Sequence, residues 1–297
     1  GTWMLFFSLQ KLKMSSPKLI QAVYHAESHR SMAAQNNISP LRYPGGKTRA
    51  RTTLLHTLEH NFDLSNINTV VSPFFGGGSF EFYLQNKLNC SIHANDKFNP
   101  LYAFWETAKT DNACLVARLR TLHEKSITKA DFTHLRQTIL DAPSLLEQAV
   151  MYFVINRCSF SGATMSGGFS AQSSAGRFTE SSIDRVEQLD LSNVSFTQSD
   201  FEPFIDSAPT EDCLMFVDPP YILGGGSKLY GTNGDLHETF DHERLAKCMK
   251  KRRGWMMTYN DCAQVRDLYS GYTIVELDWK YGMNASKSSS EIAIISV

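Results

Sequence analysis

Residues 67–87, INTVVSPFFGGGSFEFYLQNK, decide the fold class of this chain. The apolar, β-like run Ile67–Val71 leads into a turn with three successive glycines, and a helical pattern follows at Phe80–Lys87. Glycine allows positive φ and lets a backbone approach a ligand closely. The turn matches neither GxGxxG nor the Gly-Lys-Ser/Thr of a P-loop. A strand, a glycine turn and a helix in this order predict one unit of an α/β sheet.

The same alternation continues over most of the chain. Apolar runs bounded by Gly, Asn, Asp or Pro predict seven strands. They are Ile67–Val71, Cys90–Ala94, Val194–Thr197, Cys213–Val217, Trp255–Thr258, Tyr272–Leu277 and Ile292–Val297. Helical patterns at Thr48–His60, Phe80–Lys87, Asp241–Lys251 and Ala263–Tyr269 lie between several of them. Continuous apolar strands alternating with helices predict a mostly parallel sheet that is covered on both faces.

A helical region interrupts this alternation. Four helical patterns, Leu101–Lys109, Ala113–Lys125, Lys129–Leu140 and Ser144–Ile155, precede a Gly/Ser-rich stretch at Ser159–Gly176, where we expect a polar hairpin or loop. We therefore predict a catalytic domain of residues 39–106 and 191–297, an insertion at 107–190 that binds the substrate, and an N-terminal extension at 1–38. The apolar run Trp3–Leu9 is too short to span a bilayer, and the extension is either a targeting peptide or a locally packed segment.

Composition narrows the function classes. The 29 Lys and Arg against 30 Asp and Glu give a net charge of -1, so a nucleic-acid enzyme would need its positive charge concentrated locally. Six cysteines without a CxxC pair, and nine histidines without ligand-like grouping, predict reduced thiols and no metal site.

The sequence Asp218-Pro219-Pro220-Tyr221 directly follows the apolar run Cys213–Val217. In an open α/β sheet, ligands bind beyond the carboxyl ends of strands. An exocyclic aromatic amine is a poor nucleophile because its lone pair is delocalised into the ring. A carboxylate and a backbone carbonyl, each accepting one N–H, favour an attacking geometry at that nitrogen. Asp218 and the carbonyl of Pro219 fit these roles, Pro220 has no N–H to compete, and Tyr221 offers a ring on which a base can stack.

Two further elements indicate a ligand with hydroxyl and carboxylate groups. Asn95-Asp96 ends the second predicted strand, where an acid is placed to bond ribose hydroxyls. Tyr43-Pro44-Gly45-Gly46-Lys47 forms a tight turn whose lysine suits a carboxylate. Without the glycine turn, Asp96 would equally be a helix cap, and Lys47 would equally be part of a solvated basic helix start.

Taken together, the Tyr43–Lys47 turn, the glycine turn and Asp-Pro-Pro-Tyr resemble elements of the Dam-type DNA adenine methylase family, in the same order. The resemblance extends from about Ser39 to the C-terminus. Asn95–Asn99 resembles the family's ribose-binding segment, Ser199-Asp200-Phe201 its adenine-pocket segment, and Asn156-Arg157-x-x-Phe160-x-Gly162 the start of its DNA-contacting region. Thr258–Asp261 resembles a segment near its flipped-base pocket. The resemblance implies a seven-stranded, mostly parallel Rossmann-like methyltransferase sheet with a helical or hairpin insertion for DNA recognition.

The resemblance also implies an activity and a site. The enzyme would transfer a methyl group from S-adenosylmethionine to N6 of an adenine flipped out of double-stranded DNA, with Asp218, Pro219, Pro220 and Tyr221 at the target base. S-adenosyl-L-homocysteine would be the product. The implied cofactor-binding residues are Tyr43, Pro44, Gly45, Gly46, Lys47, Phe74, Phe75, Gly76, Gly78, Ser79, Asp96, Asp200 and Phe201.

For DNA contact we expect Arg42, Asn156, Arg157 and Arg177, while Lys250–Arg253 is more typical of a solvated helix end. The sequence departs from the family at residues 163–168, where GATC-recognising members carry a basic, aromatic hairpin, so the GATC site is not predicted. We expect neither a metal nor a membrane partner, and a monomer or weak dimer. The enzyme would work in the cytoplasm or wherever its DNA is replicated, which in a eukaryotic host would be the nucleus or a viral factory. The alternatives are an amino-methyltransferase of RNA adenine or of cytosine, and a catalytically dead DNA-binding relative.

Overall fold

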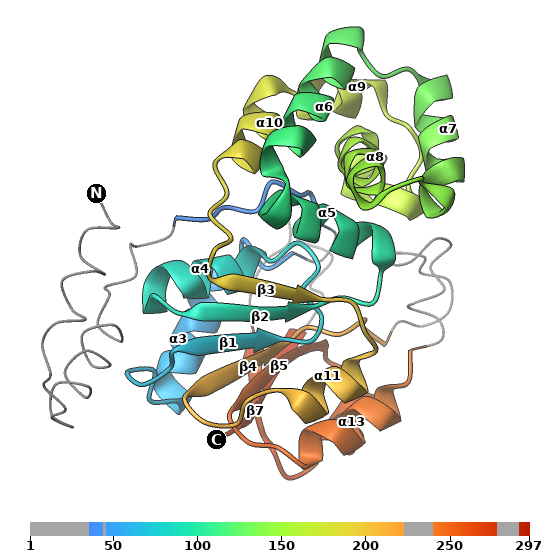
Figure 1. Ribbon diagram of the computed structural model, residues 1–297. Coiled ribbons are helices and arrows are strands. Elements are labelled where there is room, and N and C mark those ends of the chain that lie inside the picture. The colour runs from blue at the N-terminus through green and yellow to red at the C-terminus, as the bar shows by residue number, and fades with distance from the viewer. Residues whose placement is uncertain (1–35, 44–45, 223–239, 278–290) are drawn as a thin grey trace, which may run out of the picture. The chain divides into compact units, whose positions relative to one another are not determined.

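The computed structural model describes residues 36–43, 46–222, 240–277 and 291–297. In this part of the chain, seven strands form one sheet in the order β3-β2-β1-β4-β5-β7-β6 (Figure 1). The strands are β1 (Thr69–Ser72), β2 (Ser91–Asn95), β3 (Val194–Thr197), β4 (Cys213–Val217), β5 (Trp255–Asn260), β6 (Thr273–Leu277) and β7 (Glu291–Ser296). All seven predicted strands are confirmed.

The strand order creates a reversal beside β1. Strands β3, β2, β1, β4 and β5 pair in parallel, whereas β7 runs antiparallel to both β5 and β6. From β1 the chain moves outward to β2 and β3, and then returns to place β4 on the other side of β1. At such a point the connections diverge to opposite sides and leave a crevice beyond the carboxyl ends of the strands. The fold therefore predicts a ligand site beyond β1 and β4.

Two apolar cores lie on the two faces of this sheet. Alternate strand residues point to opposite faces, so Leu214 and Phe216 join one core while Met215 and Val217 join the other. Helices α3 (Arg51–Asn61) and α4 (Ser79–Leu88) contribute to the first core. Helices α11 (Phe201–Ser207), α13 (His242–Lys250) and α14 (Ala263–Leu268) contribute to the second. The predicted two-sided cover is confirmed.

The helical region forms a third core around α8 (Leu145–Cys158), whose residues from Gln148 onward are all buried. A helix that is apolar on every side is stable only when other elements surround it. Around α8 pack α5 (Asn99–Thr110), α6 (Asn112–Lys125), α7 (Lys129–Thr138) and α9 (Ala171–Arg177), while α10 (Glu180–Glu187) packs on α6. These helices lie beyond the β3 edge of the sheet in Figure 1. Helix α5 contacts both α8 and β3. The predicted domain boundary at 106/107 falls inside this one helix.

The predicted hairpin or loop at 159–176 is wrong in part. The stretch folds into the 3₁₀ turns Phe160–Gly162 and Thr164–Ser166 and then helix α9, with one isolated bridge between Ser159 and Phe169. Gly162 has φ +73°, which is not a strand conformation, and a Cβ there would come within 2.7 Å of the Cβ of Arg42. Ser170 caps α9 by accepting the N–H of Ser173. Helices α10 and α11 are additional elements that the sequence patterns did not indicate.

The folded unit begins before the predicted boundary at residue 39. Asn37 is buried, and its amide group bonds the side chain of Gln85 and both backbone groups of Asp190. These bonds join the start of the described chain to α4 and to the segment before β3. The compact unit of residues 35–297 therefore includes residues 37 and 38, and its division into a catalytic domain and an insertion stays a prediction.

The described residues lack two kinds of site. None of their helices has the length and apolar character needed to cross a membrane. They also contain no group of three or more His, Cys, Asp or Glu side chains able to hold a metal ion.

Candidate active site

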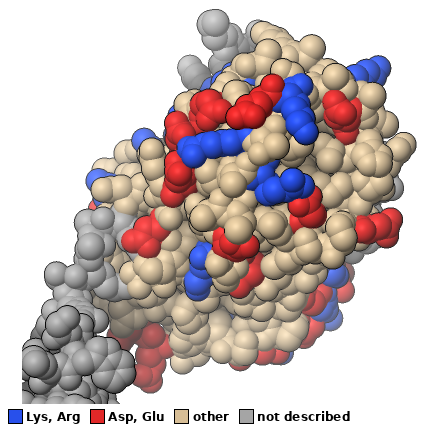
Figure 2. All heavy atoms as spheres, turned by 45° about the horizontal axis from the view of Figure 1, so that its top comes forward, with Lys and Arg blue, Asp and Glu red and all other residues tan. Residues whose placement is uncertain are grey.

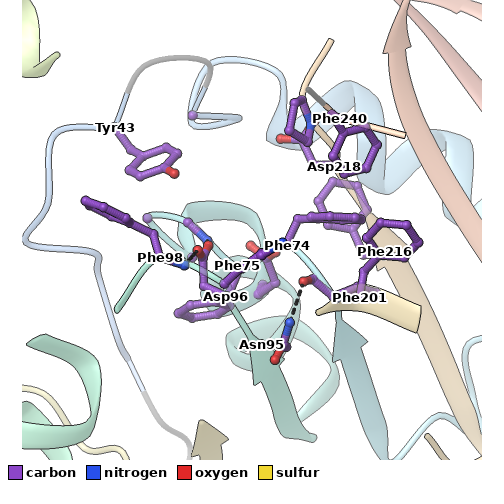
Figure 3. Close-up of a pocket in the computed structure, with 18 of the residues that line it drawn as sticks. Tyr43, Phe74, Phe75, Asn95, Asp96, Phe98, Phe201, Phe216, Asp218 and Phe240 are labelled. Atoms are coloured by element: carbon purple, nitrogen blue, oxygen red, sulfur yellow. Dashed lines mark hydrogen bonds between the residues drawn. The ribbon is translucent and has the colours of Figure 1, made fainter. Parts of the chain in front are cut away.

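A pocket follows the carboxyl edge of the sheet from β2 across β1 to β4. Its lining comes from the glycine turn after β1, the end of β2, the segment after β3, and Asp218 and Pro220 after β4. In Figure 3, Tyr43 and Phe98 lie on one side of the pocket, and Phe201, Phe216, Phe240 and Asp218 lie on the other. The empty volume is about 1360 Å³, open solvent included.

The glycine turn forms the floor of the pocket. Gly76 has φ +53°, and a Cβ there would come within 2.8 Å of the Tyr43 ring. Gly78 has φ +64°, and a Cβ there would come within 2.3 Å of the Phe75 ring. The ring of Phe75 is buried among other aromatic rings, and the buried Trp105 indole donates to the carbonyl of Gly76 at 2.9 Å. The glycines are therefore required by the close packing of Tyr43 and Phe75.

Asp96 lies immediately beyond β2. Its two carboxylate oxygens accept backbone N–H groups, one from Gly76 and one from Phe98, each at 3.0 Å. Burial raises the pKa of Asp96 to about 6, although these two hydrogen bonds act in the opposite direction. Asp96 thus fixes the glycine turn and places an ionisable carboxyl group at the pocket wall.

Asp218 lies at the centre of a hydrogen-bonded cluster. The Lys47 ammonium lies 2.9 Å from one of its carboxylate oxygens, and the Thr258 hydroxyl donates to the other at 2.6 Å. The lysine also donates to the Tyr221 hydroxyl at 2.9 Å, and that hydroxyl donates to Glu291 at 3.0 Å. Lys47 is only 3% exposed, so this ion pair is poorly screened by water. These five residues come from four separate chain segments.

The turn after β4 is clamped from β5. The side chain of Asn260 accepts the Ile222 N–H at 3.0 Å and donates to the Ile222 carbonyl at 2.6 Å. These two hydrogen bonds fix the backbone directly after Tyr221. The Tyr221 and Tyr259 rings also lie 6.0 Å apart. The Asp-Pro-Pro-Tyr turn is therefore held rigidly by its neighbours as well as by its prolines.

Asp200 and Phe201 form the far wall of the pocket. Arg244 binds Asp200 through two nitrogens, at 2.8 and 2.9 Å, and lies 4.2 Å from the centroid of the Phe201 ring. The Arg244 guanidinium is the main cause that lowers the pKa of Asp200. The rings of Phe74, Phe201 and Phe240 lie 5.4–5.7 Å apart and make this wall aromatic.

A buried carboxyl group lies beneath the pocket. Glu81 on α4 is 3% exposed, and it accepts a hydrogen bond from the Ser72 hydroxyl at 2.7 Å. Burial raises the pKa of Glu81 to about 8. The group is therefore mostly neutral at pH 7 and adds little charge beside Asp218 and Lys47.

The predicted DNA-contacting residues separate into two kinds. Asn156 and Arg157 are buried: the asparagine bonds both backbone groups of Arg42, and the arginine donates to the carbonyls of Arg177 and Pro40. Their polar groups thus fasten the helical region to the segment before Tyr43. Arg177 itself is exposed. Of the other predicted site residues, Pro44 and Gly45 lie outside the described residues.

An arginine cluster surrounds Arg157. Burial lowers the pKa of Arg157 to about 10, and the charges of Arg42, Arg185 and Arg177 add to this effect. Burial and the charge of Arg177 likewise lower the pKa of Arg42. Phe160, 67% exposed, belongs to the same loop as Ala163, Thr164 and Met165, which line the pocket. Arg157, at the end of α8, and the exposed ring of Phe160 are thus connected to the pocket lining by one loop.

The outer face of the helical region is different. Figure 2 shows acidic and basic side chains interspersed over this face. Arg118 pairs with Glu147 at 2.9 Å, and Arg120 pairs with Glu187 at 2.7 Å and with Asp184 at 3.1 Å. Paired charges give no extended field of one sign, so this face is not suited to a DNA backbone.

Sequence reasoning missed several residues of the site. Glu81, Arg244, Phe240 and Glu291 take part in it, yet none belongs to a recognised motif. Glu291 and Phe240 had no usable signal, because each reaches the site only through strand order and helix placement. Glu81 had a weak signal, since it is an acid inside the otherwise apolar start of α4.

The sheet order, the antiparallel β7 and the acidic prolyl turn at the reversal point define a Rossmann-like methyltransferase. The family model of D12 class N6 adenine-specific DNA methyltransferases matches residues 43–283. The chain therefore belongs to this family and is an enzyme that methylates adenine in DNA, which confirms the resemblance found in the sequence. It is similar to the Type II methyltransferase M.MjaIII of Methanocaldococcus jannaschii, with 23% identity over 272 residues that cover 82% of this chain and 92% of the relative.

Proposed function

We propose that the chain transfers the methyl group of S-adenosylmethionine to N6 of an adenine held outside the stack of double-stranded DNA. The observation that carries the proposal is the single pocket that joins the glycine turn and Asp96 at one end to Asp218 at the other. Such a pocket fits two ligands that meet near the prolyl turn.

The residues of the pocket fit the cofactor. Asp96 offers a carboxylate suited to ribose hydroxyls, Lys47 offers a cation suited to the methionine carboxylate, and Phe74 and Phe201 offer rings suited to adenine. Arg244 keeps Asp200 ionised and oriented, so its carboxylate can accept a hydrogen bond from the adenine amino group. When bound, S-adenosylmethionine supplies an electrophilic methyl group. Gly76, Gly78, Gly46, Ser79 and Tyr43 complete the proposed binding set.

Asp218 and the Pro219 carbonyl would hold the target amino group. Each accepts one N–H, which orients the nitrogen lone pair for attack. Thr258 and Lys47 fix the carboxylate of Asp218 in advance, so little reorganisation is required when the base arrives. Asp218 is also the group at this position that can accept the proton released when N6 becomes a secondary amine.

The target adenine must leave the duplex to reach Asp218. Within a duplex the amino group is stacked and paired, and extruding the nucleotide costs roughly a few kcal/mol. We propose that phosphates of the DNA lie against Arg42, Arg177 and Arg185, where a polyanion would relieve the mutual repulsion of the arginines. The exposed ring of Phe160 is available for a base or sugar contact. Arg157 and Asn156 would support this surface from beneath.

We also propose that the enzyme acts as a monomer. One chain supplies Lys47, Asp218 and the whole described lining of the pocket, so a monomer would carry a complete site. We propose that the enzyme works wherever its DNA is replicated, whether cytoplasm, nucleus or viral factory.

The test is methyl transfer from labelled S-adenosylmethionine to duplex DNA of mixed sequence, followed by nucleoside analysis. We expect N6-methyladenine with the wild type and none with Asp218→Ala, while calorimetry shows that this variant still binds the cofactor. RNA and cytosine-rich substrates serve as controls for the alternative acceptors. Label in another nucleoside, or near-wild-type turnover by Asp218→Ala, would contradict the mechanism.

A further inference from the structure

The first residue of β7 reaches the active edge of the sheet because of the direction of that strand. Parallel strands bring their carboxyl ends to the edge where the ligand binds, whereas an antiparallel strand brings its amino end there. Glu291, the first residue of β7, pairs with Asn260 at the end of β5. Its side chain therefore lies beside the prolyl turn, even though it is 70 residues from Tyr221 in sequence.

The contacts of Glu291 determine the polarity of the Tyr221 hydroxyl. A lysine ammonium can only donate, so the hydroxyl accepts from Lys47 at 2.9 Å. The hydroxyl then has a single hydrogen left to donate, and it donates to the Glu291 carboxylate at 3.0 Å. The same glutamate oxygen lies 4.0 Å from the Lys47 ammonium. The tyrosine is thus held from both sides by groups of opposite charge.

This arrangement sets the ring as well as the hydroxyl. The oxygen of a tyrosine lies on the axis about which its ring turns, so fixing the oxygen fixes where the ring lies. Because the phenol O–H favours the plane of the ring, its hydrogen bond to Glu291 also favours one orientation of that plane. Glu291 is only 5% exposed and is paired on one side with Asn260 of β5 and on the other with Leu277 of β6, so its backbone is a firm anchor. Burial, together with the charges of Asp218 and Glu291, keeps the pKa of Tyr221 well above its ordinary value, so the phenol remains a donor.

We propose that Glu291 is a positioning residue for methyl transfer: through the Tyr221 hydroxyl it holds in place the ring on which the target base stacks. The inference rests on the proposed function, since it deepens the role of the same site. Displacing a reacting group by about 1 Å can cost about 100-fold in rate. Glu291 touches neither proposed ligand, so cofactor affinity should depend on it little.

The test compares Glu291→Leu, which removes both charge and acceptor, with Glu291→Gln, which retains an acceptor oxygen. Steady-state methyl transfer at saturating cofactor is measured on a DNA that the wild type methylates, which gives kcat, alongside cofactor affinity and thermal midpoint. We expect kcat to fall about 10- to 100-fold in Glu291→Leu and less in Glu291→Gln, with the cofactor Kd within about threefold of the wild type. Glu276→Gln, at an exposed position on the adjacent strand β6, is the matched control and should leave kcat unchanged.

A double-mutant cycle separates positioning from general damage. If Glu291 acts through the Tyr221 hydroxyl, Glu291→Leu should reduce kcat much less in a Tyr221→Phe background than in the wild type. Additive losses in the cycle, wild-type kcat in Glu291→Leu, or losses that follow the cofactor Kd or the thermal midpoint would each overturn the inference. A wild type that methylates no DNA would instead refute the proposed function, before any Glu291 variant is compared.

Discussion

Replacing Lys47 with methionine tests whether the cation holds the site together. Methionine retains much of the volume of lysine but leaves Asp218 without its ion-pair partner. Removing one member of a buried pair typically costs about 3–5 kcal/mol, because an uncompensated charge stays in the interior. Lys47 is 3% exposed, which favours the full cost. Asp218 is 22% exposed and keeps its bond from Thr258, which reduces it. We therefore expect a loss near the lower bound, about 3 kcal/mol.

The free energy of unfolding is measured by urea denaturation at pH 7, and cofactor affinity by calorimetry. If Lys47 also binds the methionine carboxylate, the cofactor Kd should rise by roughly 10- to 100-fold, since a hydrogen bond to a charged group contributes about 1.5–3 kcal/mol. Lys125→Met, at an exposed position at the end of α6, is the control and should change the free energy of unfolding by less than about 0.5 kcal/mol. A Lys47→Met protein as stable as this control would refute the assignment of a buried ion pair.

Further substitutions test the turn, the carboxyl group and the arginine cluster. Gly78→Ala should lower the free energy of unfolding by about 2 kcal/mol or more in urea denaturation, because the positive φ of Gly78 and its contact with a buried ring both oppose a Cβ. The control is Gly176→Ala in α9, where a Cβ meets open space, and this change should be neutral or stabilising. The pKa of Asp96 is about 6, and its ionised form is the one that accepts hydrogen bonds from ribose hydroxyls. Calorimetry should therefore show the cofactor Kd rising about tenfold per pH unit below pH 6, and this dependence should vanish in Asp96→Asn. Arg185→Ala should reduce the slope of log DNA affinity against log salt by about 1, measured by fluorescence anisotropy, and Arg120→Ala, whose charge is already paired, should leave that slope unchanged.

The predicted DNA contact of Arg157 illustrates how tertiary packing changes the interpretation of a motif. In the sequence, Asn156-Arg157 resembles the start of a DNA-contacting region, and its arginine suggests a phosphate ligand. In the structure the guanidinium donates to two backbone carbonyls and is 8% exposed. The charge still acts on its neighbours, since it lies among three other arginines. Arg157 therefore supports the backbone of neighbouring segments, and contact between this region and DNA stays a prediction.

Local chemistry was sufficient for much of the fold. Short apolar runs predicted all seven strands, because a strand buried on both faces of a sheet needs apolar residues at successive positions. The glycine turn and the Asp-Pro-Pro-Tyr turn were equally legible, since positive φ and fixed prolyl φ restrict the residues that fit. The Gly/Ser-rich stretch was not legible in this way, because its small polar residues suit a turn, a cap and a short helix alike. In the structure it forms two 3₁₀ turns and α9.

The sequence by itself determined the strands, the two turns and the type of chemistry, because each depends on residues close together in the chain. Only the tertiary structure decided which side chains surround Asp218. Lys47, Thr258, Tyr221 and Glu291 meet because parallel strands end where an antiparallel strand begins, and that order is set by the packing of the whole sheet. The sequence contains the parts of the site, and long-range packing determines their geometry and charge.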